Sequence, residues 1–276
     1  MSQTGWRRNP WSRSRRSDPM TPDNSPDLWG NALPRPARDA HKYHRGHLVI
    51  LGAERFTGAT RLAAESGSRI GAGLVTVLSS SQAETYYATL PADIMVAETT
   101  LSEVRKPTVL LAGPGGCTDS QAQAVLDADP AISRVLDADA IRLHNDLPPI
   151  STIFTPHAGE FERYFGPITS DKSGRALQIA AKTQAVMVLK GPETIIAGPD
   201  GRAVRNTTAS PYLAKAGTGD VLAGMIAGLT AQGMPIFDAA CAGVWLHGRA
   251  AQKVGPGLIP QDLIAELPVL LRDVLA

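Results

Sequence analysis

The sequence has little cysteine, no long apolar run and no large excess of either charge. Its two cysteines, Cys117 and Cys241, are far apart in a chain of 276 residues and form no CxxC pair. This spacing argues against a disulfide framework and against a zinc site. No stretch approaches the roughly 18 apolar residues that cross a membrane, and the N-terminus lacks the apolar segment of a signal peptide. We therefore expect a cytoplasmic protein with no membrane partner.

The formal net charge of +1 gives no indication of a nucleic-acid partner. The basic excess is confined to the first 20 residues, where five arginines face the single acid Asp18. Residues 1–40 are rich in Arg, Ser, Pro and Asp without apolar periodicity, which predicts a disordered or loosely packed N-terminal arm. The start of this arm also resembles an organelle transit peptide, and a start codon placed too early, with Met20 as the true beginning, is a further interpretation.

From His47 onward, short β-branched runs alternate with longer alanine-rich segments. This alternation predicts an α/β fold with a mostly parallel sheet and helices on both faces, in a single domain over residues 41–276. The expected strands are His47–Leu51, Leu74–Leu78, Ile94–Ala97, Thr108–Ala112, Arg134–Leu136, Thr152–Phe154, Val186–Leu189 and Thr194–Ala197. The expected helices are Ala59–Ile70, Ser120–Asp127, Lys172–Thr183, Val221–Ala231, Phe237–Val254 and Gln261–Val274.

Two common nucleotide-binding motifs are missing, the phosphate loop that ends in Gly-Lys-Ser/Thr and the dinucleotide fingerprint. The chain instead has KAGTGDVLAGMIAGL (215–229), in which a Gly-Thr-Gly turn opens an apolar helix with Asp220 at its start. Unpaired backbone N–H groups at a helix start favour an anion, typically phosphate. A carboxylate beside them could take a proton from a hydroxyl that attacks phosphorus. Alternatively, Asp220 only complements the helix dipole, and this segment alone does not decide between the two.

Two more turns directly follow apolar strands. In the first, Lys190 could meet phosphate and Thr194 could hydrogen-bond it, although Lys-Gly is common in ordinary turns. In the second, TPHAGEF (155–161), His157 could donate to a ligand and Glu160 could hold a metal-bound water. The simpler interpretation makes Glu160 a helix cap.

Three weaker signals remain. The turn GPGG (113–116) either lets a bulky ligand lie against the backbone or is only a tight turn. Of Asp137 and Asp139, which end an expected strand, we expect one to face a cleft and the other to cap a helix. Three nearby histidines suggest a metal site but lack a credible fourth ligand: His41, His44 and His47.

In chain order, these segments resemble the ADP/ATP-dependent NAD(P)H-hydrate dehydratases, members of the ribokinase-like superfamily with a three-layer α/β/α fold. The resemblance covers roughly residues 41–275. It is carried by HKYHRG (41–46), FTGA (56–59), GAGLVTV (71–77), GPGG (113–116), LDADAI (136–141), TPHAGEF (155–161), LKGPETIIAGPDG (189–201), AKAGTGDVLAGMIAGLTAQG (214–233) and VWLHGRAA (244–251). The chain departs from the family pattern at GAE (52–54), TGA (57–59) and SPYL (210–213).

The resemblance implies roles for individual residues. Asp220 would be the general base and would meet the hydrated dinucleotide, whose other matching positions are Gly58, Ala59, Gly115 and His157. The matching positions for the adenine nucleotide are Lys190, Gly191, Pro192, Glu193, Thr194, Gly217, Thr218 and Gly219. Mg²⁺ is the expected counter-ion, with Glu160 as its protein contact through a water.

The resemblance also implies a reaction, the ADP- or ATP-dependent dehydration of the S epimer of NAD(P)H hydrate, and the bacterial branch favours ADP. It implies a homo-oligomer such as a tetramer. Some members carry an N-terminal epimerase domain, and because only about 40 residues precede the match, we expect the NAD(P)H-hydrate epimerase on a separate chain. Two alternatives remain open, a small-molecule kinase acting on a vitamin-precursor alcohol and a non-catalytic nucleotide-binding sensor.

Overall fold

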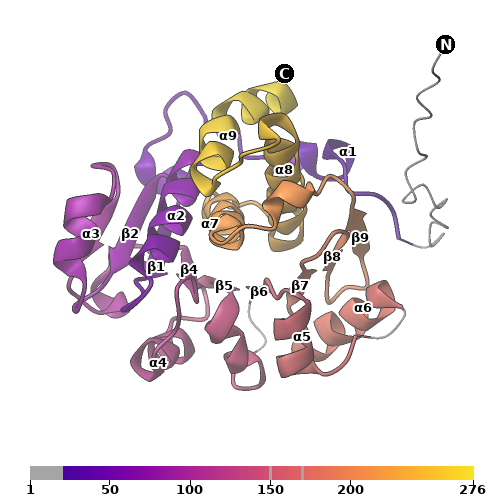
Figure 1. Ribbon diagram of the computed structural model, residues 1–276. Coiled ribbons are helices and arrows are strands. Elements are labelled where there is room, and N and C mark those ends of the chain that lie inside the picture. Colours follow the sequence, from indigo (N-terminus) through magenta and orange to yellow (C-terminus); the bar gives the residue numbers. More distant parts are fainter. Residues whose placement is uncertain (1–20, 149–150, 169–170) are drawn as a thin grey trace, which may run out of the picture.

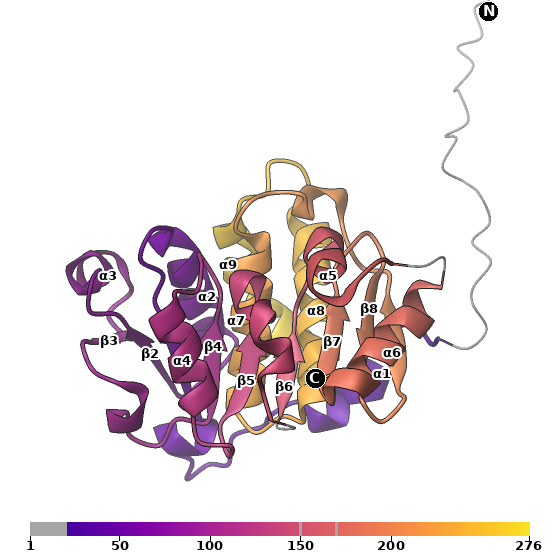
Figure 2. The same cartoon turned by 90° about the horizontal axis from the view of Figure 1, so that it is seen from below.

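The computed structural model describes residues 21–148, 151–168 and 171–276, whose strands form one sheet (Figure 2). Their order is β3-β2-β1-β4-β5-β6-β7-β8-β9. Neighbours from β3 to β7 pair in parallel, and β8 and β9 add an antiparallel edge. The strands are β1 His47–Leu51, β2 Leu74–Leu78, β3 Met95–Ala97, β4 Val109–Ala112, β5 Ser133–Leu136, β6 Thr152–Phe154, β7 Val186–Leu189, β8 Thr194–Ala197 and β9 Ala203–Asn206.

Helices cover both faces of the sheet, which confirms the predicted three-layer α/β/α fold (Figure 1). One face carries α2 (Thr57–Arg69), α7 (Thr218–Ala231), α8 (Ile236–Val254) and α9 (Pro260–Leu275), with the short α1 (Pro26–Trp29) and α3 (Ala83–Thr89) at its margins. The other face carries α4 (Asp119–Asp127), α5 (Ala158–Phe165) and α6 (Lys172–Thr183). Short 3₁₀ helices span Gly30–Ala32, Lys42–Arg45, Leu101–Glu103, Ala138–Asn145 and Pro211–Leu213.

Two apolar cores lie between these layers because side chains alternate along each strand. In β1, Leu48 and Ile50 enter the core under α7 and α8, whereas Val49 and Leu51 enter the core under α4 and α6. Every residue of β1 is buried. A strand covered on both faces gives the continuous apolar run seen in the sequence.

Helix α7 lies at the centre of its layer and is buried on nearly all sides. A side chain at Gly224 would bring its Cβ within 2.1 Å of the Ala63 carbonyl oxygen, so only glycine allows α2 to pass this closely. Ser66 of α2 donates from Oγ to the carbonyl of Val221 at 3.0 Å. These contacts hold the first half of α7 in a fixed position beside the second half of α2.

Residues 21–33 differ from the loosely packed arm that the sequence predicts. Trp29 is buried and packs edge-on against Trp245 of α8, with ring centroids 5.8 Å apart. Asn24 is also buried: its amide donates to Asn206 and to the Cys241 carbonyl, and its oxygen accepts from Trp29 Nε1. This segment is held by polar side chains that pair with distant residues. Such pairing produces no apolar periodicity, so the sequence pattern could not reveal it. The transit-peptide and early-start interpretations concern residues 1–20, which lie outside the described residues.

Candidate active site

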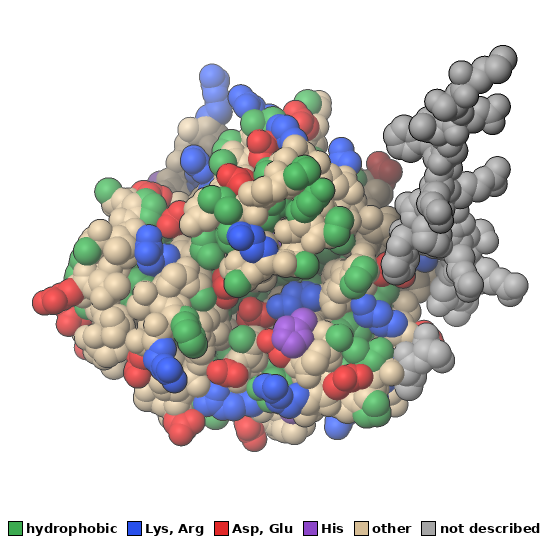
Figure 3. All heavy atoms as spheres, in the orientation of Figure 1, with side chains coloured by type: hydrophobic (Ala, Val, Ile, Leu, Met, Phe, Trp, Pro, Cys, Tyr) green, Lys and Arg blue, Asp and Glu red, His purple; other side chains and the backbone are tan. Residues whose placement is uncertain are grey.

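The glycine-rich turns gather at the carboxyl ends of the strands, beside the first turn of α7. Residues in these turns follow β1, β4, β5, β6 and β7, whose carboxyl ends lie at one edge because the strands are parallel. Figure 3 shows acidic, basic and histidine side chains together in a hollowed part of this face, between α7 and α5. This edge is therefore the candidate site.

The Gly-Thr-Gly turn opens α7 in a form suited to an anion. Gly217 is the N-cap residue with φ of 95°, a left-handed conformation that favours glycine. Thr218 fastens the turn because its Oγ1 donates to the carbonyls of Leu213 and Lys215, at 2.8 and 2.9 Å. The first N–H groups of a helix have no acceptor within the helix and favour an anion. Thr218 N donates to the Lys215 carbonyl at 3.4 Å and Val221 N to the Gly217 carbonyl at 3.1 Å, so the Gly219 N–H between them is the group best placed for a ligand.

Lys190 and Asp137 form an ion pair at the ends of β7 and β5. The Lys190 ammonium donates to Asp137 Oδ1 at 2.9 Å, and Thr155 Oγ1 donates to the same oxygen at 2.7 Å. Burial opposes the charge of Lys190, but the carboxylates of Asp137, Glu160 and Asp220 raise the pKa of its ammonium above the ordinary value. Lys190 therefore stays charged. A Cβ built on Gly219 would lie 3.5 Å from Lys190 Nζ, which places this cation beside the turn.

Asp220 stands half-buried in the first turn of α7. Burial and the negative charge of Asp137 raise its pKa to about 6, against the opposing effect of Lys190. A carboxylate with this pKa is ionised near neutral pH and still basic enough to accept a proton. The same residue thus combines the position and the acidity that a general base requires.

His157 and Glu160 cap α5 reciprocally. His157 N donates to Glu160 Oε2 at 2.8 Å, and Glu160 N donates to His157 Nδ1 at 3.2 Å. The helix-cap alternative for Glu160 is thus present in the structure. The His157 side chain nevertheless remains 61% exposed. A bridge between His157 and Lys190, with Lys190 N donating to the Pro156 carbonyl at 2.8 Å, brings the two turns side by side.

The FTGA and GPGG turns meet at the start of α2. A Cβ on Gly115 would lie 2.5 Å from the Phe56 carbonyl and 3.2 Å from the Ala59 Cβ. Thr60 ties the two segments by donating to the Pro114 carbonyl at 3.1 Å. Gly58 has open space where a side chain would stand. The predicted substrate positions Gly58, Ala59 and Gly115 are therefore brought together.

The segment after β7 is held as a compact turn. Thr194 Oγ1 donates to the Gly191 carbonyl at 3.2 Å, and Lys172 of α6 donates to the Glu193 carbonyl. Pro192 lies between these two contacts in the chain. The sequence did not indicate Lys172, whose ammonium also lies 3.0 Å from a Cβ built on Gly191.

Comparison with known proteins agrees with this geometry. A family model described as NAD(P)H-hydrate dehydratase matches residues 47–268. The chain belongs to the NAD(P)H-hydrate dehydratase family.

Two relatives in the family illustrate the range of the match. A bifunctional NAD(P)H-hydrate repair enzyme of Coxiella burnetii is 35% identical over 87% of this chain and 53% of its own length. An ADP-dependent (S)-NAD(P)H-hydrate dehydratase of Neisseria meningitidis is 33% identical over 79% of this chain and 80% of its own length. The chain spans about half the length of the bifunctional relatives.

A solved structure of the family has the same fold. The ADP/ATP-dependent NAD(P)H-hydrate dehydratase of Bacillus subtilis, co-crystallised with ATP and Mg²⁺, superimposes with a TM-score of 0.81 at 30% identity. The match covers 92% of this chain and 99% of that one. The fold is ribokinase-like, as the sequence predicts.

The side chains at this edge of the sheet show whether the site fits the Mg²⁺ that the family resemblance implies. Within the described ranges, no three His, Cys, Asp or Glu side chains form a group that could hold a metal on their own. Mg²⁺ is commonly bound by one or two carboxylates together with substrate phosphates. The carboxylates of Asp137, Glu160 and Asp220 all act on the Lys190 ammonium, and this gathering of negative charge fits a cation arriving with a nucleotide.

His41, His44 and His47 make contacts that do not form a metal site. His47 is buried, with Nε2 2.7 Å from Thr76 Oγ1 and Nδ1 2.9 Å from the Arg105 carbonyl. His41 and His44 stack on each other with ring centroids 3.6 Å apart. The metal interpretation of these histidines is therefore not supported.

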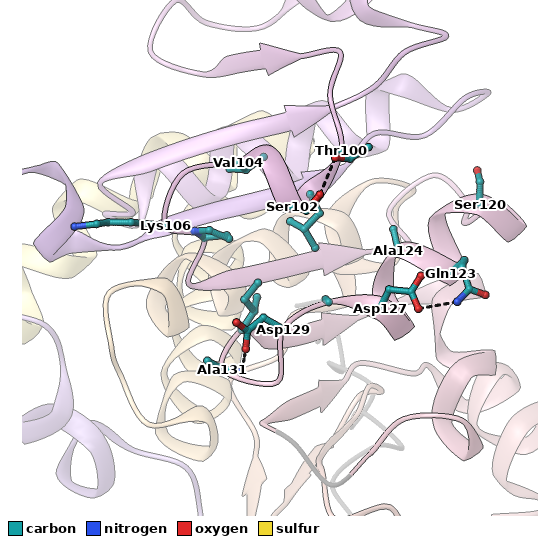
Figure 4. Close-up of a pocket in the computed structure, with 14 residues that line it drawn as sticks. Thr100, Ser102, Val104, Lys106, Ser120, Gln123, Ala124, Asp127, Asp129 and Ala131 are labelled. Carbon is teal, nitrogen blue, oxygen red and sulfur yellow. Dashed lines mark hydrogen bonds between the residues drawn. The ribbon is translucent and has the colours of Figure 1, made fainter.

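A separate hollow of about 850 Å³ lies along α4, on the face of the sheet that this helix covers (Figure 4). Residues of the Thr100–Pro107 segment, one side of α4 and the turn before β5 line it. In this hollow Gln123 donates to Asp127 at 2.8 Å. It contains no residue of the predicted site, so the size of a cavity does not identify the functional edge of this dehydratase-family chain.

Proposed function

We propose that this protein dehydrates the S epimer of NAD(P)H hydrate back to NAD(P)H, with ADP or ATP as phosphoryl donor. The observation that carries the proposal is the position of Asp220. Its half-buried carboxylate, with a pKa of about 6, lies in the first turn of α7, and the Lys190 ammonium lies beside Gly219 of the same turn. Family membership supplies the substrate class.

The proposed chemistry solves a leaving-group problem. The hydroxyl at C6 of the reduced nicotinamide ring is expelled poorly as hydroxide. Asp220 takes the hydroxyl proton while the oxygen attacks the terminal phosphorus of the nucleotide, and the bond from phosphorus to the remaining nucleotide breaks. The product is a phosphate ester at C6. Loss of phosphate with the proton at C5 then restores the ring double bond.

The two sides of Asp220 would bind the two substrates. Lys190, Gly191, Pro192, Glu193 and Thr194, with Gly217, Thr218 and Gly219, would hold the adenine nucleotide. Gly58, Ala59, Gly115 and His157 would contact the dinucleotide. Mg²⁺ would balance the phosphate charge, with Glu160 as a contact through water. The charge of Lys190 would stabilise the negative charge of the transferred phosphoryl group.

A direct assay tests this proposal. Purified protein is mixed with NADH hydrate, Mg²⁺ and either ADP or ATP, and the absorbance of NADH is followed. We expect recovery of the absorbance from the S epimer, with ADP as the preferred donor. Absence of recovery with both nucleotides would overturn the proposal.

The same assay separates the alternatives. A kinase would consume ATP with an alcohol substrate and leave the hydrate unchanged, and a sensor would bind nucleotide without turnover. The exposed ring of His157, whose backbone pairs with that of Lys190, supports a second, extended substrate on this edge. It therefore favours the dehydratase.

Three further properties belong to this proposal. We propose that the protein is a homo-oligomer such as a tetramer and that it is located in the cytoplasm. Within the described residues, no helix is both long and apolar enough to cross a membrane. The related bifunctional repair enzymes unite two functions in one chain. That the NAD(P)H-hydrate epimerase acts here from a separate chain stays a prediction.

A further inference from the structure

His247 of α8 makes a buried contact with the turn that opens α7. Its Nε2 lies 2.9 Å from the carbonyl oxygen of Thr218, and the residue is only 6% exposed. A carbonyl oxygen accepts hydrogen bonds and cannot donate them, so Nε2 must carry the proton. Burial, together with the charge of Lys190, lowers the pKa of His247 to about 4, so the ring is a neutral donor at physiological pH.

This hydrogen bond acts on the peptide group that carries the Gly219 N–H. The Thr218 carbonyl and the Gly219 N–H belong to one planar trans peptide and point in opposite directions. In a helix the carbonyl points toward the C-terminus and the N–H toward the N-terminus, where the anion site lies. Holding the carbonyl from α8 therefore fixes the direction of the Gly219 N–H.

Contacts from several elements support the turn. Thr218 Oγ1 ties it to the carbonyls of Leu213 and Lys215. A Cβ on Gly217 would meet Leu62 at 2.7 Å and Pro260 at 2.9 Å, so α2 and α9 also close around it. His247 supplies the support from α8, and a buried imidazole is a costly choice where an apolar side chain would pack.

We propose that His247 is a positioning residue for phosphoryl transfer: its Nε2–H bond to Thr218 aims the Gly219 N–H at the phosphoryl group. The turnover part of this inference rests on the proposed function. The nucleotide-binding part does not, because it concerns only the anion held at the start of α7.

Two substitutions separate positioning from packing. His247→Met removes the donor and keeps a side chain of similar size, whereas His247→Gln can place an amide N–H near the position of Nε2. His47→Met is the matched control, because His47 is also a buried imidazole bonded through Nε2, but at the opposite end of β1. Each variant is measured for kcat, for KM of ADP, and for the dissociation constants of ADP and adenosine.

We expect His247→Met to lower kcat about tenfold or more, less than the 10²–10³ typical of deleting a donor outright. Its affinity for ADP should fall while that for adenosine stays the same, and His247→Gln should restore both properties to within about threefold of the unmodified protein. His47→Met should leave the ADP-to-adenosine ratio unchanged.

An unchanged ratio in His247→Met, equal losses in Met and Gln variants, or the same loss in His47→Met would each overturn the inference. If the unmodified protein fails to dehydrate the hydrate but the ratio changes as expected, the proposed function fails and the positioning role stands.

Discussion

Asp137 and Lys190 form an ion pair of 2.9 Å that joins the ends of β5 and β7 beneath the candidate site. The exposed fractions of the two side chains are only 6% and 18%. The pair keeps Lys190 charged, and the Asp137 carboxylate also faces Asp220 and raises its pKa. We expect Lys190 to contact the phosphate and Asp220 to contact the substrate hydroxyl. Asp137 contacts neither ligand, but its carboxylate sets the charge of Lys190 and the pKa of Asp220.

The pH dependence of the reaction tests this coupling. Because Asp220 must be ionised to accept a proton, kcat/KM should fall as the pH falls through about 6. In Asp137→Asn the negative neighbour is lost and Lys190 becomes available to Asp220, so this acidic limb should move to lower pH. Asp139→Asn, which changes an exposed carboxylate two residues away, should leave the limb in place. An unmoved limb in Asp137→Asn would contradict the coupling.

Replacing Asp220 by Asn should separate catalysis from nucleotide binding. We expect turnover to fall on the order of 10² or more because the general base is lost. The dissociation constant for ADP should stay nearly the same, since the backbone N–H groups and Lys190 remain. Turnover equal to that of the unmodified protein would remove Asp220 from the mechanism.

The same substitution should stabilise the fold at high pH. The pKa of Asp220 is raised to about 6 from 3.8, so its contribution to stability is fully present below about pH 4 and is lost as the pH rises through 6. At pH 8 the ionised carboxylate therefore costs the folded state up to roughly 3 kcal/mol, which Asp220→Asn relieves. Denaturant unfolding should show the variant more stable at pH 8 and equal to the unmodified protein below pH 4. A variant less stable at pH 8 would show that burial does not penalise this charge.

The role of the His157 ring can be separated from its role as the cap of α5. His157→Ala removes both the ring and the helix cap, whereas His157→Asn removes the ring and keeps a side chain suited to an N-cap. We expect both variants to weaken binding of the dinucleotide about tenfold, the effect of one lost hydrogen bond, while the affinity for ADP is retained. Calorimetric titration with NADPH and with ADP measures the two effects. Equal loss for both ligands would argue against a substrate role of this ring.

The close crossing of α2 and α7 predicts a large packing effect. In Gly224→Ala the new Cβ would lie 2.1 Å from a backbone oxygen, so the helices must separate, at a cost of about 1–3 kcal/mol or more. Gly30→Ala is the control, because Gly30 has ordinary helical φ of −59° and nothing within 4 Å of its Cβ position. The free energy of unfolding should drop in the first variant and stay or rise slightly in the second. Equal stabilities would contradict the close packing.

The parts of the fold that could be predicted are those encoded by neighbouring residues. Eight strands and the six long helices follow from apolar periodicity and from turn glycines, with boundaries that differ by at most three residues. β9 was not predicted, because in AVRN only one of four residues is a buried apolar side chain. Helix α3 was not predicted because its AETYYAT sequence lacks a continuous apolar stripe.

In the candidate site too, the features that could be predicted are those encoded by neighbouring residues. The turn of α7 and the segments around Lys190 and His157 could be found from local sequence. The partner of Lys190 could not, because Asp137 lies 53 residues earlier and the sequence indicates only that one of two acids faces a cleft. His247 gave no local signal either, since a histidine in an apolar helix is compatible with many burial patterns.

The bonds of Asn24 impose an order on the assembly of the chain. Its amide donates to the carbonyl of Cys241, which lies 217 residues later, and Asn24 N donates to the Arg205 carbonyl at the outer side of β9. During synthesis this early segment emerges long before its acceptors exist. The hydrogen bond from Asn24 can therefore form only after Cys241 of α8 is in place. Because this contact joins residues far apart in the sequence, we expect it to form late and slowly in the folding reaction.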